Sequence, residues 1–284
     1  MTSPDPAPGA ALYAPDLLAG RVAVVTGTSP NIGGVMAAGL AAAGAVVACN
    51  DVDPDTAKAT AERIVAAGGT AEAVAFDVTD EDAAGDAVAG IAARHGRIDI
   101  LVNNAVKFDQ AGLLDMTLER YRRQLDIILG GAFIMTRAAA SAMIAGGIRG
   151  TIVNVLSTAA WQGQAGNVGY STAKSGLINF TRSVAMELAP HGIRVNGFTP
   201  TATQPDDPEL AAGFQRAVAA GAERRIMDFA GLNPWERLPT PADYVAPLIF
   251  LCSDGAGMMT GTNLTVDGGA LARYWPQFPR RAGS

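Results

Sequence analysis

A tyrosine and a lysine four residues apart, Tyr170 and Lys174, could together move a proton. In an α-helix this spacing puts both side chains on one face. A free tyrosine has a pKa of about 10, and a neighbouring ammonium favours the phenolate, so we expect a lowered pKa. Tyr170 could then accept a proton from an alcohol or return one to a ketone. Ser157, thirteen residues earlier, could hydrogen-bond the substrate oxygen and polarise it.

The sequence holds two histidines, His95 and His191, and each stands directly before a glycine. Helices often end in this way, because glycine adopts the left-handed cap conformation and a basic residue interacts favourably with the helix dipole. A Ser-His-Asp triad or a histidine-ligated metal centre would need one of these two residues. We therefore expect both histidines at helix ends, and we expect neither that triad nor a metal site.

A glycine-rich stretch that begins at Gly27 and ends at Gly33-Gly34 stands between a short apolar run and an alanine-rich one. Glycine lets the backbone turn sharply and approach a pyrophosphate, and the following helix offers its free N–H groups to the anion. Asp51 lies 18 residues after Gly33, at the end of the second expected strand. A carboxylate there can accept hydrogen bonds from both hydroxyls of an adenosine ribose.

The charges around Asp51 bear on which nucleotide binds. No arginine or lysine lies between Arg21 and Lys58 to receive the 2′-phosphate of NADP. The sequence therefore predicts NAD as the cofactor, bound at least about tenfold more tightly than NADP, which needs only about 1.4 kcal/mol. Asp51 could instead cap the next helix, as the nearby Asp53 and Asp55 could.

Short β-branched runs alternate with alanine-rich stretches along the whole chain. Strands that are apolar on both faces and separated by helices indicate a parallel sheet covered on both sides. We predict a single Rossmann-type domain with a doubly wound, seven-stranded parallel sheet. The expected strands are 21–26, 45–50, 71–76, 98–103, 151–156, 194–198 and 263–266, and the expected helices are 32–43, 56–67, 80–94, 118–144, 168–189 and 241–252.

Composition limits the partners and the compartment. The net charge of −6 argues against nucleic acid or an anionic membrane surface. Cys49 and Cys252 stand far apart in apolar runs, as expected of small core residues in a reducing compartment, so we expect a cytoplasmic protein. The start of the chain lacks the pattern of a signal peptide. Residues 22–50 carry no charge, but a polar run interrupts them and the rest is too weakly apolar to span a membrane.

The chain divides into a domain and two tails. Residues 1–18 are expected to be a flexible tail, 19–270 the NAD-binding domain, and 271–284 a C-terminal tail. Within the domain, 200–237 is a long irregular segment that we expect to cover the substrate, as loops after strand ends do in open α/β sheets.

Six motifs follow one another along the chain, and together they are far more specific than any one alone. They are Thr26-Gly27 with Gly33, Asp77, Asn103-Asn104-Ala105, Ser157 with Tyr170 and Lys174, Arg194-Val195-Asn196 with Pro200, and Gly261 to Gly268-Gly269. In this order and spacing, the sequence from Arg21 to Gly269 resembles the short-chain dehydrogenase/reductase family.

The resemblance implies an NAD(P)-dependent oxidoreductase that interconverts a secondary alcohol and a ketone on a small molecule. It implies Ser157, Tyr170 and Lys174 as catalytic residues, with Tyr170 as general acid/base, and a homotetramer. It places Asp77 at the adenine, Asn104 on the adenosine side and Lys174 at the nicotinamide ribose. The expected cofactor-binding residues are Gly27, Ser29, Asn31, Ile32, Gly33, Asp51, Asp77, Val78, Asn104, Tyr170, Lys174, Pro200 and Thr203.

Four positions depart from the family pattern. Asn31 replaces a glycine of the phosphate loop, although asparagine tolerates a left-handed backbone better than most residues. Val106 and Thr201 also stand where the family has glycine. Ile128 stands where the family usually has an asparagine that completes a catalytic tetrad and holds a water leading from the lysine to solvent. An isoleucine cannot hold that water, so the proton route is left open.

The substrate pocket is the least defined part of the sequence. The resemblance suggests that Trp161 and Gln164 line it together with Ser157 and Tyr170. Aromatic and aliphatic residues in segment 200–237 suggest an apolar substrate, although they could equally well pack that segment onto the core. These residues are Phe214, Ile226, Met227, Phe229, Leu232 and Trp235.

A second function class stays open beside the enzyme. The departures from the family pattern would suit a non-redox NAD-binding sensor or scaffold on the same fold, whereas the intact Ser157, Tyr170 and Lys174 favour the enzyme. The long helices and the apolar end at 271–278 resemble the interface elements of a homo-oligomer.

Overall fold

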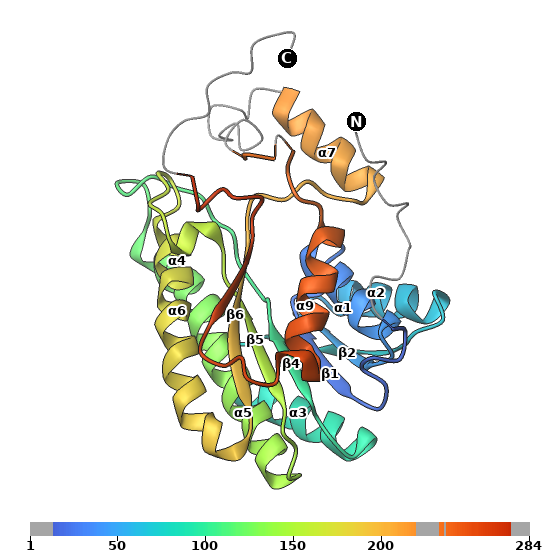
Figure 1. The fold of residues 1–284 in the computed structure, drawn as a ribbon. Helices are drawn as coiled ribbons and strands as arrows, with labels where there is room; N and C mark the ends of the chain where they lie inside the picture. The colour runs from blue at the N-terminus through green and yellow to red at the C-terminus, as the bar shows by residue number, and fades with distance from the viewer. Residues whose placement is uncertain (1–13, 220–232, 236, 274–284) are drawn as a thin grey trace.

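Seven parallel strands form one sheet in the order β3-β2-β1-β4-β5-β6-β7, which confirms the predicted fold class (Figure 1). In the computed structural model, residues 14–219, 233–235 and 237–273 are described. The chain reverses its winding between β1 and β4, which pair with each other. A crevice for ligands forms at such a point, outside the carboxyl ends of the strands. The strands are β1 Val22–Thr26, β2 Val46–Asp51, β3 Thr70–Ala75, β4 Ile100–Asn103, β5 Thr151–Val155, β6 Arg194–Pro200 and β7 Asn263–Val266.

Helices cover both faces of the sheet, and most of them lie within a few residues of their predicted ranges. They are α1 Ile32–Ala42, α2 Pro54–Ala66, α3 Glu81–His95, α4 Leu118–Leu125, α5 Gly131–Ala145, α6 Val168–Leu188, α7 Pro208–Ala219 and α9 Val245–Cys252. The prediction that 200–237 is wholly irregular is wrong, because α7 lies inside that segment. The expected helix 241–252 begins as a 3₁₀ turn, Pro241–Tyr244.

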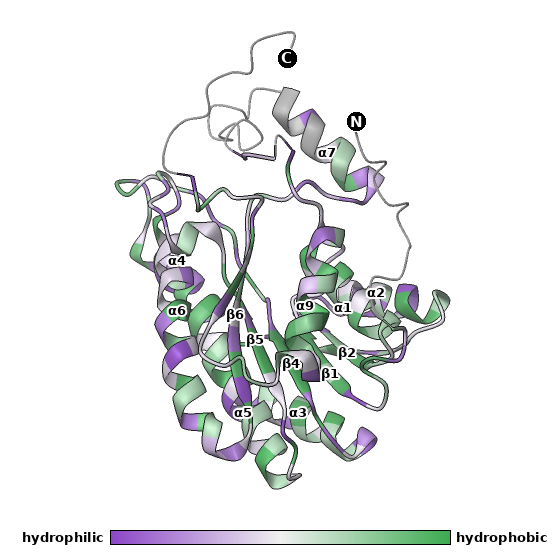
Figure 2. Cartoon of the chain, viewed as in Figure 1, coloured by the Kyte–Doolittle hydropathy of each residue, from purple (hydrophilic) through white to green (hydrophobic). Residues whose placement is uncertain are grey.

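Two apolar clusters occupy the two faces of the sheet. The central strands are coloured mostly as hydrophobic residues in Figure 2. One cluster packs α1 and α9 against the sheet and includes Leu18, which stands at the end of the predicted tail. The other packs α3 and α5 on the opposite face. Strands β1, β4 and β5 are buried throughout, as predicted. The outermost strand β3 is mostly exposed or half-buried, so for it the prediction of two apolar faces is wrong.

The expected helix 118–144 is interrupted by a π-helical turn over Asp126–Gly130. By length and composition alone, the stretch 118–145 could cross a membrane. Its second half instead contributes Met135, Ala139 and Met143 to the core. Core helices of globular proteins pass the same test, so the stretch is read here as a core helix.

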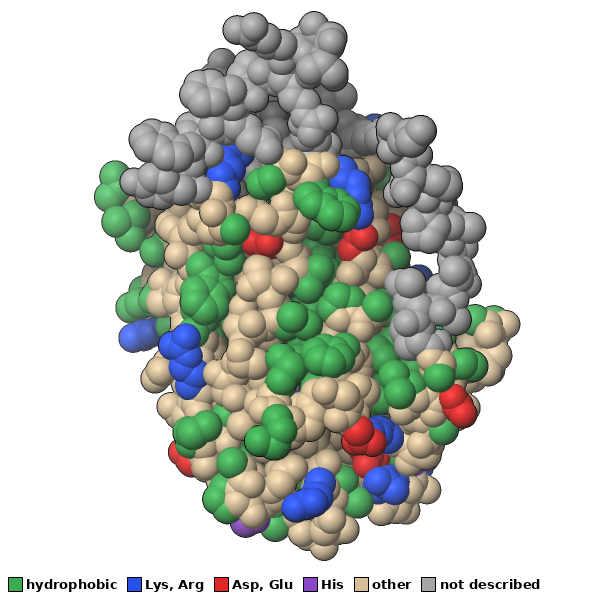
Figure 3. Space-filling model, in the orientation of Figure 1, with side chains coloured by type: hydrophobic (Ala, Val, Ile, Leu, Met, Phe, Trp, Pro, Cys, Tyr) green, Lys and Arg blue, Asp and Glu red, His purple; other side chains and the backbone are tan. Residues whose placement is uncertain are grey.

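The structure bears out the expected helix ends and cysteines. Gly96 and Gly192, the residues after the two histidines, both have left-handed backbones, with φ of +75° and +73°. Cys49 and Cys252 are buried and free. On the face shown in Figure 3, basic side chains of the described residues are scattered among acidic ones and form no continuous patch. Residues 1–13 of the predicted tail 1–18, and residues 274–284 of the predicted tail 271–284, lie outside the described residues.

Candidate active site

The three predicted catalytic residues come together at the carboxyl ends of β5 and the first turns of α6. Ser157 follows β5, and its hydroxyl accepts the N–H of Ala159 at 3.1 Å to begin a 3₁₀ turn. The Ser157 hydroxyl lies near enough to the Tyr170 hydroxyl to lower the pKa of the tyrosine. Lys174 lies one helical turn beyond Tyr170, with its Nζ 5.7 Å from the centre of the tyrosine ring. The predicted shared helix face is therefore confirmed.

Burial sets the protonation of this pair. Lys174 is 3% exposed, and its Nζ donates to the carbonyl oxygen of Val155 at 2.5 Å. Burial lowers the pKa of Lys174 to about 7. Burial also raises the pKa of Tyr170 above its usual value, against the opposing effect of the hydrogen bond with Ser157. For the chain without nucleotide, burial therefore outweighs the opposing effect of Ser157. The expected fall in the tyrosine pKa relies also on the positive charge of the nicotinamide, and it stays a prediction for the enzyme with nucleotide bound.

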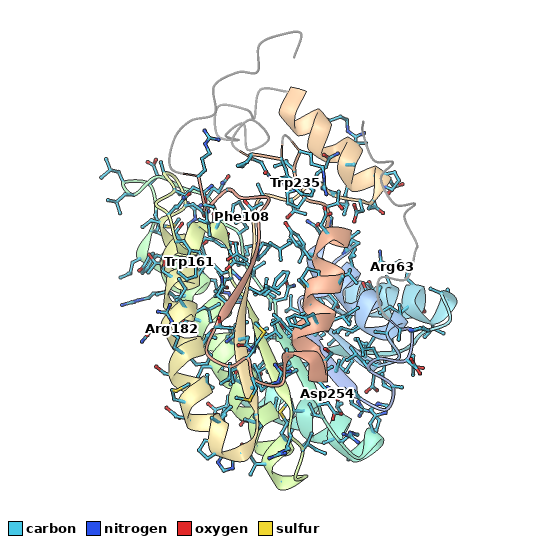
Figure 4. All side chains as sticks on the ribbon, in the orientation of Figure 1. Arg63, Phe108, Trp161, Arg182, Trp235 and Asp254 are labelled. Atoms are coloured by element: carbon cyan, nitrogen blue, oxygen red, sulfur yellow. The ribbon has the colours of Figure 1, made fainter. Side chains whose placement is uncertain are left out.

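Phe108 packs against the ring of Tyr170, and no sequence motif pointed to it. Its ring meets that of Tyr170 edge to face, with centroids 5.1 Å apart, and it is 54% exposed. Ala111, in the same loop after β4, pairs with Asn167 just before α6. Figure 4 shows Phe108 at the carboxyl ends of the strands. The available signal was its place, since loops that follow strand ends carry binding residues.

The glycine-rich loop between β1 and α1 has the close backbone packing that a pyrophosphate cradle requires. Gly27 has a φ of +68°, and a Cβ on Gly33 would lie 2.0 Å from the Gly27 carbonyl oxygen. Asn104 holds the loop from β4, because its Nδ2 donates to the carbonyl oxygens of Thr26 at 3.2 Å and Gly27 at 2.8 Å. The amide nitrogen of Asn104 is thus used to fix the loop. The residues present fit a dinucleotide whose phosphates meet the first turn of α1.

Asn31 fits the loop for a different reason from the predicted one. Its φ of −132° and ψ of −134° are not left-handed, so the expectation of a left-handed asparagine is wrong. The turn is instead closed by the N–H of Gly34, which donates to the carbonyl oxygen of Ser29 at 2.9 Å. Ile32 then starts α1. The side-chain oxygen of Asn31 is buried without a protein partner.

Asp51 ends β2, and the structure rejects the alternative that it caps α2. Asp53 is the N-cap, since its carboxylate accepts the N–H of Asp55 and the hydroxyl of Thr56. Asp51 accepts the N–H of Asp53 at 3.2 Å within the turn. The carboxylate of Asp51 therefore stays at the strand end, where a ribose would lie.

The other predicted cofactor residues also lie at or just after strand ends. Asp77 accepts the N–H of Thr79 at 2.9 Å and pairs with Arg123 at 2.9 Å. Val78 borders a small cavity beside Lys174. Pro200 ends β6, and the hydroxyl of Thr203 shares hydrogen bonds with the Thr201 carbonyl oxygen and the Tyr244 hydroxyl.

Ile128 lies in the π-helical turn and is 2% exposed. It packs with side chains of α5 and α6, including Ala132 and Leu177. One helical turn earlier, Gln124 is fully buried, and neither of its amide atoms has a protein partner. The polar side chain of Gln124 thus lies one helical turn before position 128, where the family usually has an asparagine.

The predicted substrate residues are not all brought to Tyr170. Trp161 donates its indole N–H to the Thr199 hydroxyl at 3.3 Å and lies in a groove between α6 and β7, with Arg182 among its neighbours. Gln164 accepts a hydrogen bond from Asn167 at 2.9 Å. Trp235 is 71% exposed. Figure 4 shows Trp235 and Phe108 on the same side of the sheet. Ile226, Met227, Phe229 and Leu232 lie outside the described residues, as does the side chain of Phe214.

Known proteins match this chain over nearly its whole length. Residues 27–270 match a family model described as enoyl-(acyl carrier protein) reductase. The chain is 35% identical to sorbitol dehydrogenase of Cereibacter sphaeroides, with 89% of this chain and 98% of that protein covered. It is 38% identical to cis-4-hydroxycyclohexanecarboxylate dehydrogenase of Sinomonas cyclohexanicum, with 90% and 99% covered.

A solved structure from Beutenbergia cavernae, described as an NAD(P)-dependent gluconate 5-dehydrogenase with NADP bound at low occupancy, matches with a TM-score of 0.80. Its sequence is 37% identical, and 92% of this chain and all of that chain are covered. The chain therefore belongs to the short-chain dehydrogenase/reductase family. It is an NAD(P)-dependent oxidoreductase of the alcohol and ketone class, and the non-redox alternative is not favoured.

Proposed function

We propose that this chain oxidises a secondary alcohol to a ketone, or reverses that reaction, with NAD as the preferred nucleotide and Tyr170 as general acid/base. The observation that supports this most directly is the arrangement of Ser157, Tyr170 and Lys174: two neighbouring hydroxyls with a buried amine one helical turn beyond the tyrosine. A catalytic proton donor or acceptor must reach the substrate oxygen, and both hydroxyls converge where that oxygen would bind.

Each residue has a separate task. When bound, the nicotinamide nucleotide accepts or supplies the hydride. Ser157 donates a hydrogen bond to the substrate oxygen and holds it against the tyrosine hydroxyl. Tyr170 removes the alcohol proton in oxidation and returns it in reduction. Lys174, in its protonated form, stabilises the phenolate, and it can bind the nicotinamide ribose through a further N–H.

The preference for NAD rests on Asp51. Its carboxylate would repel a 2′-phosphate, since two anions at hydrogen-bonding distance have no cation between them. The fold brings Arg63 of α2 to a groove that also includes Pro30 of the phosphate loop, a cation that the sequence argument did not consider. Arg63 donates to the hydroxyl of Thr60 at 3.0 Å. Because Arg63 is hydrogen-bonded within its own helix, Asp51 sets the preference for NAD.

Phe108 favours a substrate that has an apolar face. A half-exposed aromatic ring beside the general acid/base offers an apolar face to the carbon skeleton that carries the hydroxyl. We propose a small alcohol with a C–H-rich face, and the named substrates of the two dehydrogenases above are the first ones to test.

We also propose that the chain forms a homotetramer in the cytoplasm. The domain boundaries that we propose lie near residues 19 and 270. Large apolar side chains are exposed on the long helices: Leu118 on α4, Phe133 on α5 and Met186 on α6, at 59%, 49% and 62%. Burying such side chains in a subunit interface would be favourable. Light scattering at micromolar concentration should show a tetramer, and a monomer alone would contradict this part of the proposal.

The decisive experiment compares the wild-type enzyme with Tyr170→Phe. A panel of polyols, sugars, hydroxycyclohexanecarboxylates and their ketones is screened by the absorbance of NADH. Tyr170→Phe should lower turnover by about 10² to 10⁴ while NAD binding stays nearly unchanged, because only the proton donor and acceptor is removed. Tyr121→Phe, on α4, is the matched control and should keep full activity. Undiminished turnover in Tyr170→Phe would overturn the mechanism.

A further inference from the structure

The loop that follows β4 carries Phe108 to Tyr170 without secondary structure of its own. None of the residues 106–110 belongs to a helix or a strand, and most of them are exposed. The Phe108 ring is 54% exposed and meets the Tyr170 ring with centroids 5.1 Å apart. A loop with few buried contacts opens easily. An exposed ring on such a loop keeps one position only if neighbouring residues anchor the chain.

The residue directly after Phe108 is anchored by an ion pair. The carboxylate of Asp109 accepts two hydrogen bonds from the guanidinium of Arg120: Nε donates to Oδ2 at 2.8 Å, and Nη2 donates to Oδ1. Two parallel hydrogen bonds fix the orientation of both side chains as well as their separation. The two side chains are 26% and 40% exposed, so the pair is partly shielded from water.

The place of Arg120 in α4 is unfavourable for the helix by itself. Thr117 is the N-cap and accepts the N–H of Arg120 at 3.2 Å, so Arg120 lies in the first turn. The positive end of the helix dipole opposes a cation there and favours an acid, such as Glu119. The hydrogen bonds of the pair lower the pKa of Asp109 and raise the pKa of Arg120. Pairing with the loop, and not stability of α4, therefore accounts for this arginine.

Two further contacts hold the loop on either side of this pair. Before Phe108, Nδ2 of Asn104 donates to backbone carbonyl oxygens of the loop after β1. After Asp109, Ala111 pairs with Asn167 just before α6, and both residues are buried. The bridge ties the loop to the start of α6, and the ion pair ties it to α4. Phe108 thus stands between two anchored residues, Asn104 and Asp109, and the ion pair is the anchor next to it.

We propose that the ion pair between Asp109 and Arg120 sets substrate affinity by holding the Phe108 ring against Tyr170. Asp109 and Arg120 are then positioning residues that act through Phe108. The inference rests on the proposed function, in which this ring meets the apolar face of the alcohol. Such a contact is made in the bound substrate and in the transition state alike. Its loss should therefore raise KM and leave kcat nearly unchanged.

Two variants break the pair from opposite sides. Asp109→Asn removes the charge of the loop, and its control, Asp115→Asn, removes the same charge from an exposed position of the same loop. Arg120→Met removes the donors, and Arg122→Met, two residues further along α4, is its control. On the alcohol that the wild type oxidises fastest, Asp109→Asn and Arg120→Met should raise KM about tenfold, as loss of an apolar contact does. In both, kcat should stay within about twofold of wild type, and the controls should match wild type.

A double-mutant cycle tests whether the pair acts through the ring. Phe108→Ala should raise KM as much as Asp109→Asn does, and the two changes together should raise it no further.

The inference is overturned, and the proposed function stands, if the two changes add, if KM stays constant in either single variant, if kcat falls instead, or if Asp115→Asn has the same effect. If the wild type turns over no alcohol, the proposed function fails. A crystal structure of Asp109→Asn then decides: a displaced Phe108 ring supports the positioning role, and a ring still packed on Tyr170 refutes it.

Discussion

Two polar regions at the carboxyl ends of the strands differ in how fully their hydrogen-bonding groups are paired. In the loop after β1, the Thr28 hydroxyl and Nδ2 of Asn104 donate to backbone carbonyl oxygens, while Oδ1 of Asn31 is buried without a protein partner. Beside the catalytic pair, Lys174 has one acceptor, while Oδ1 of Asn103 and both amide atoms of Gln124 have no protein partner.

The difference corresponds to the tasks of the two regions. The phosphate loop binds with its backbone, so it must be rigid before the anion arrives, and paired side chains make it so. The catalytic region handles a proton, and a lysine with unused donors can exchange partners as substrate and water come and go. Unpaired buried groups reduce stability, so we expect changes in the loop to impair binding and changes beside Lys174 to trade stability against activity.

The largest loss of NAD affinity should come from adding one carbon atom to the loop after β1. In Gly33→Ala the new Cβ would lie 2.0 Å from the Gly27 carbonyl oxygen, so the backbone must shift. NAD affinity should fall at least about a hundredfold, or about 2.7 kcal/mol, as measured by calorimetric titration. Gly85→Ala in α3, where a Cβ meets nothing within 4 Å, should leave affinity unchanged. Equal affinities of wild type and Gly33→Ala would show that the loop is not the phosphate site.

The second change replaces the buried lysine by an apolar residue of similar length. Lys174 has a pKa of about 7 when folded and about 10.5 when unfolded. Between these values the unfolded chain binds the extra proton, so wild-type stability rises with pH. Lys174→Met should therefore abolish activity yet raise the Tm at pH 7 by about 2–4 °C for each kcal/mol recovered.

The gain in Tm should shrink as the pH approaches 10, which thermal unfolding at several pH values would reveal. Lys58→Met is the control, since Lys58 is exposed and pairs with Glu62 at 3.9 Å. A Tm for Lys174→Met below that of wild type at pH 7 would mean that the buried lysine is better paired than its single acceptor indicates.

A smaller effect, on the preference for NAD over NADP, is expected when Asp51 is changed. Asp51→Asn removes the charge that repels a 2′-phosphate, so the preference for NAD over NADP should fall about tenfold, or about 1.4 kcal/mol. The ratio of kcat/KM for the two nucleotides measures it. Asp53→Asn, which keeps a capping side chain two residues further on, should leave the ratio as it is. If Asp53→Asn changes the ratio as much, the general charge of the turn sets the preference and Asp51 has no special role.

The smallest effect on activity should follow Ile128→Asn, which restores the family residue. If other waters carry the proton between Lys174 and solvent, turnover should change by less than about threefold, because a bridging water is nearly as good as a direct contact. Ile128→Val controls for the lost volume. A rise of tenfold or more in Ile128→Asn alone would show that proton exchange was limited by the isoleucine.

Sequence alone determined the order of strands and helices, because the alternation of apolar runs and the glycine punctuation are local properties of the chain. It also determined that Ser157, Asp51 and the glycine loop stand at strand ends and that Tyr170 and Lys174 share one face of a helix, since motif spacing fixes where each element begins and ends.

Tertiary structure alone decided which groups meet. The exposure of β3 follows from its place at the edge of the sheet, and the π-helical turn at Ile128 and helix α7 were not apparent in the spacing of residues. Phe108 reaches Tyr170, and Asn103 is fixed beside Lys174, through segments more than sixty residues apart in the chain. Hydrogen-bond partners and burial depend on such distant contacts, so no local pattern could have assigned them.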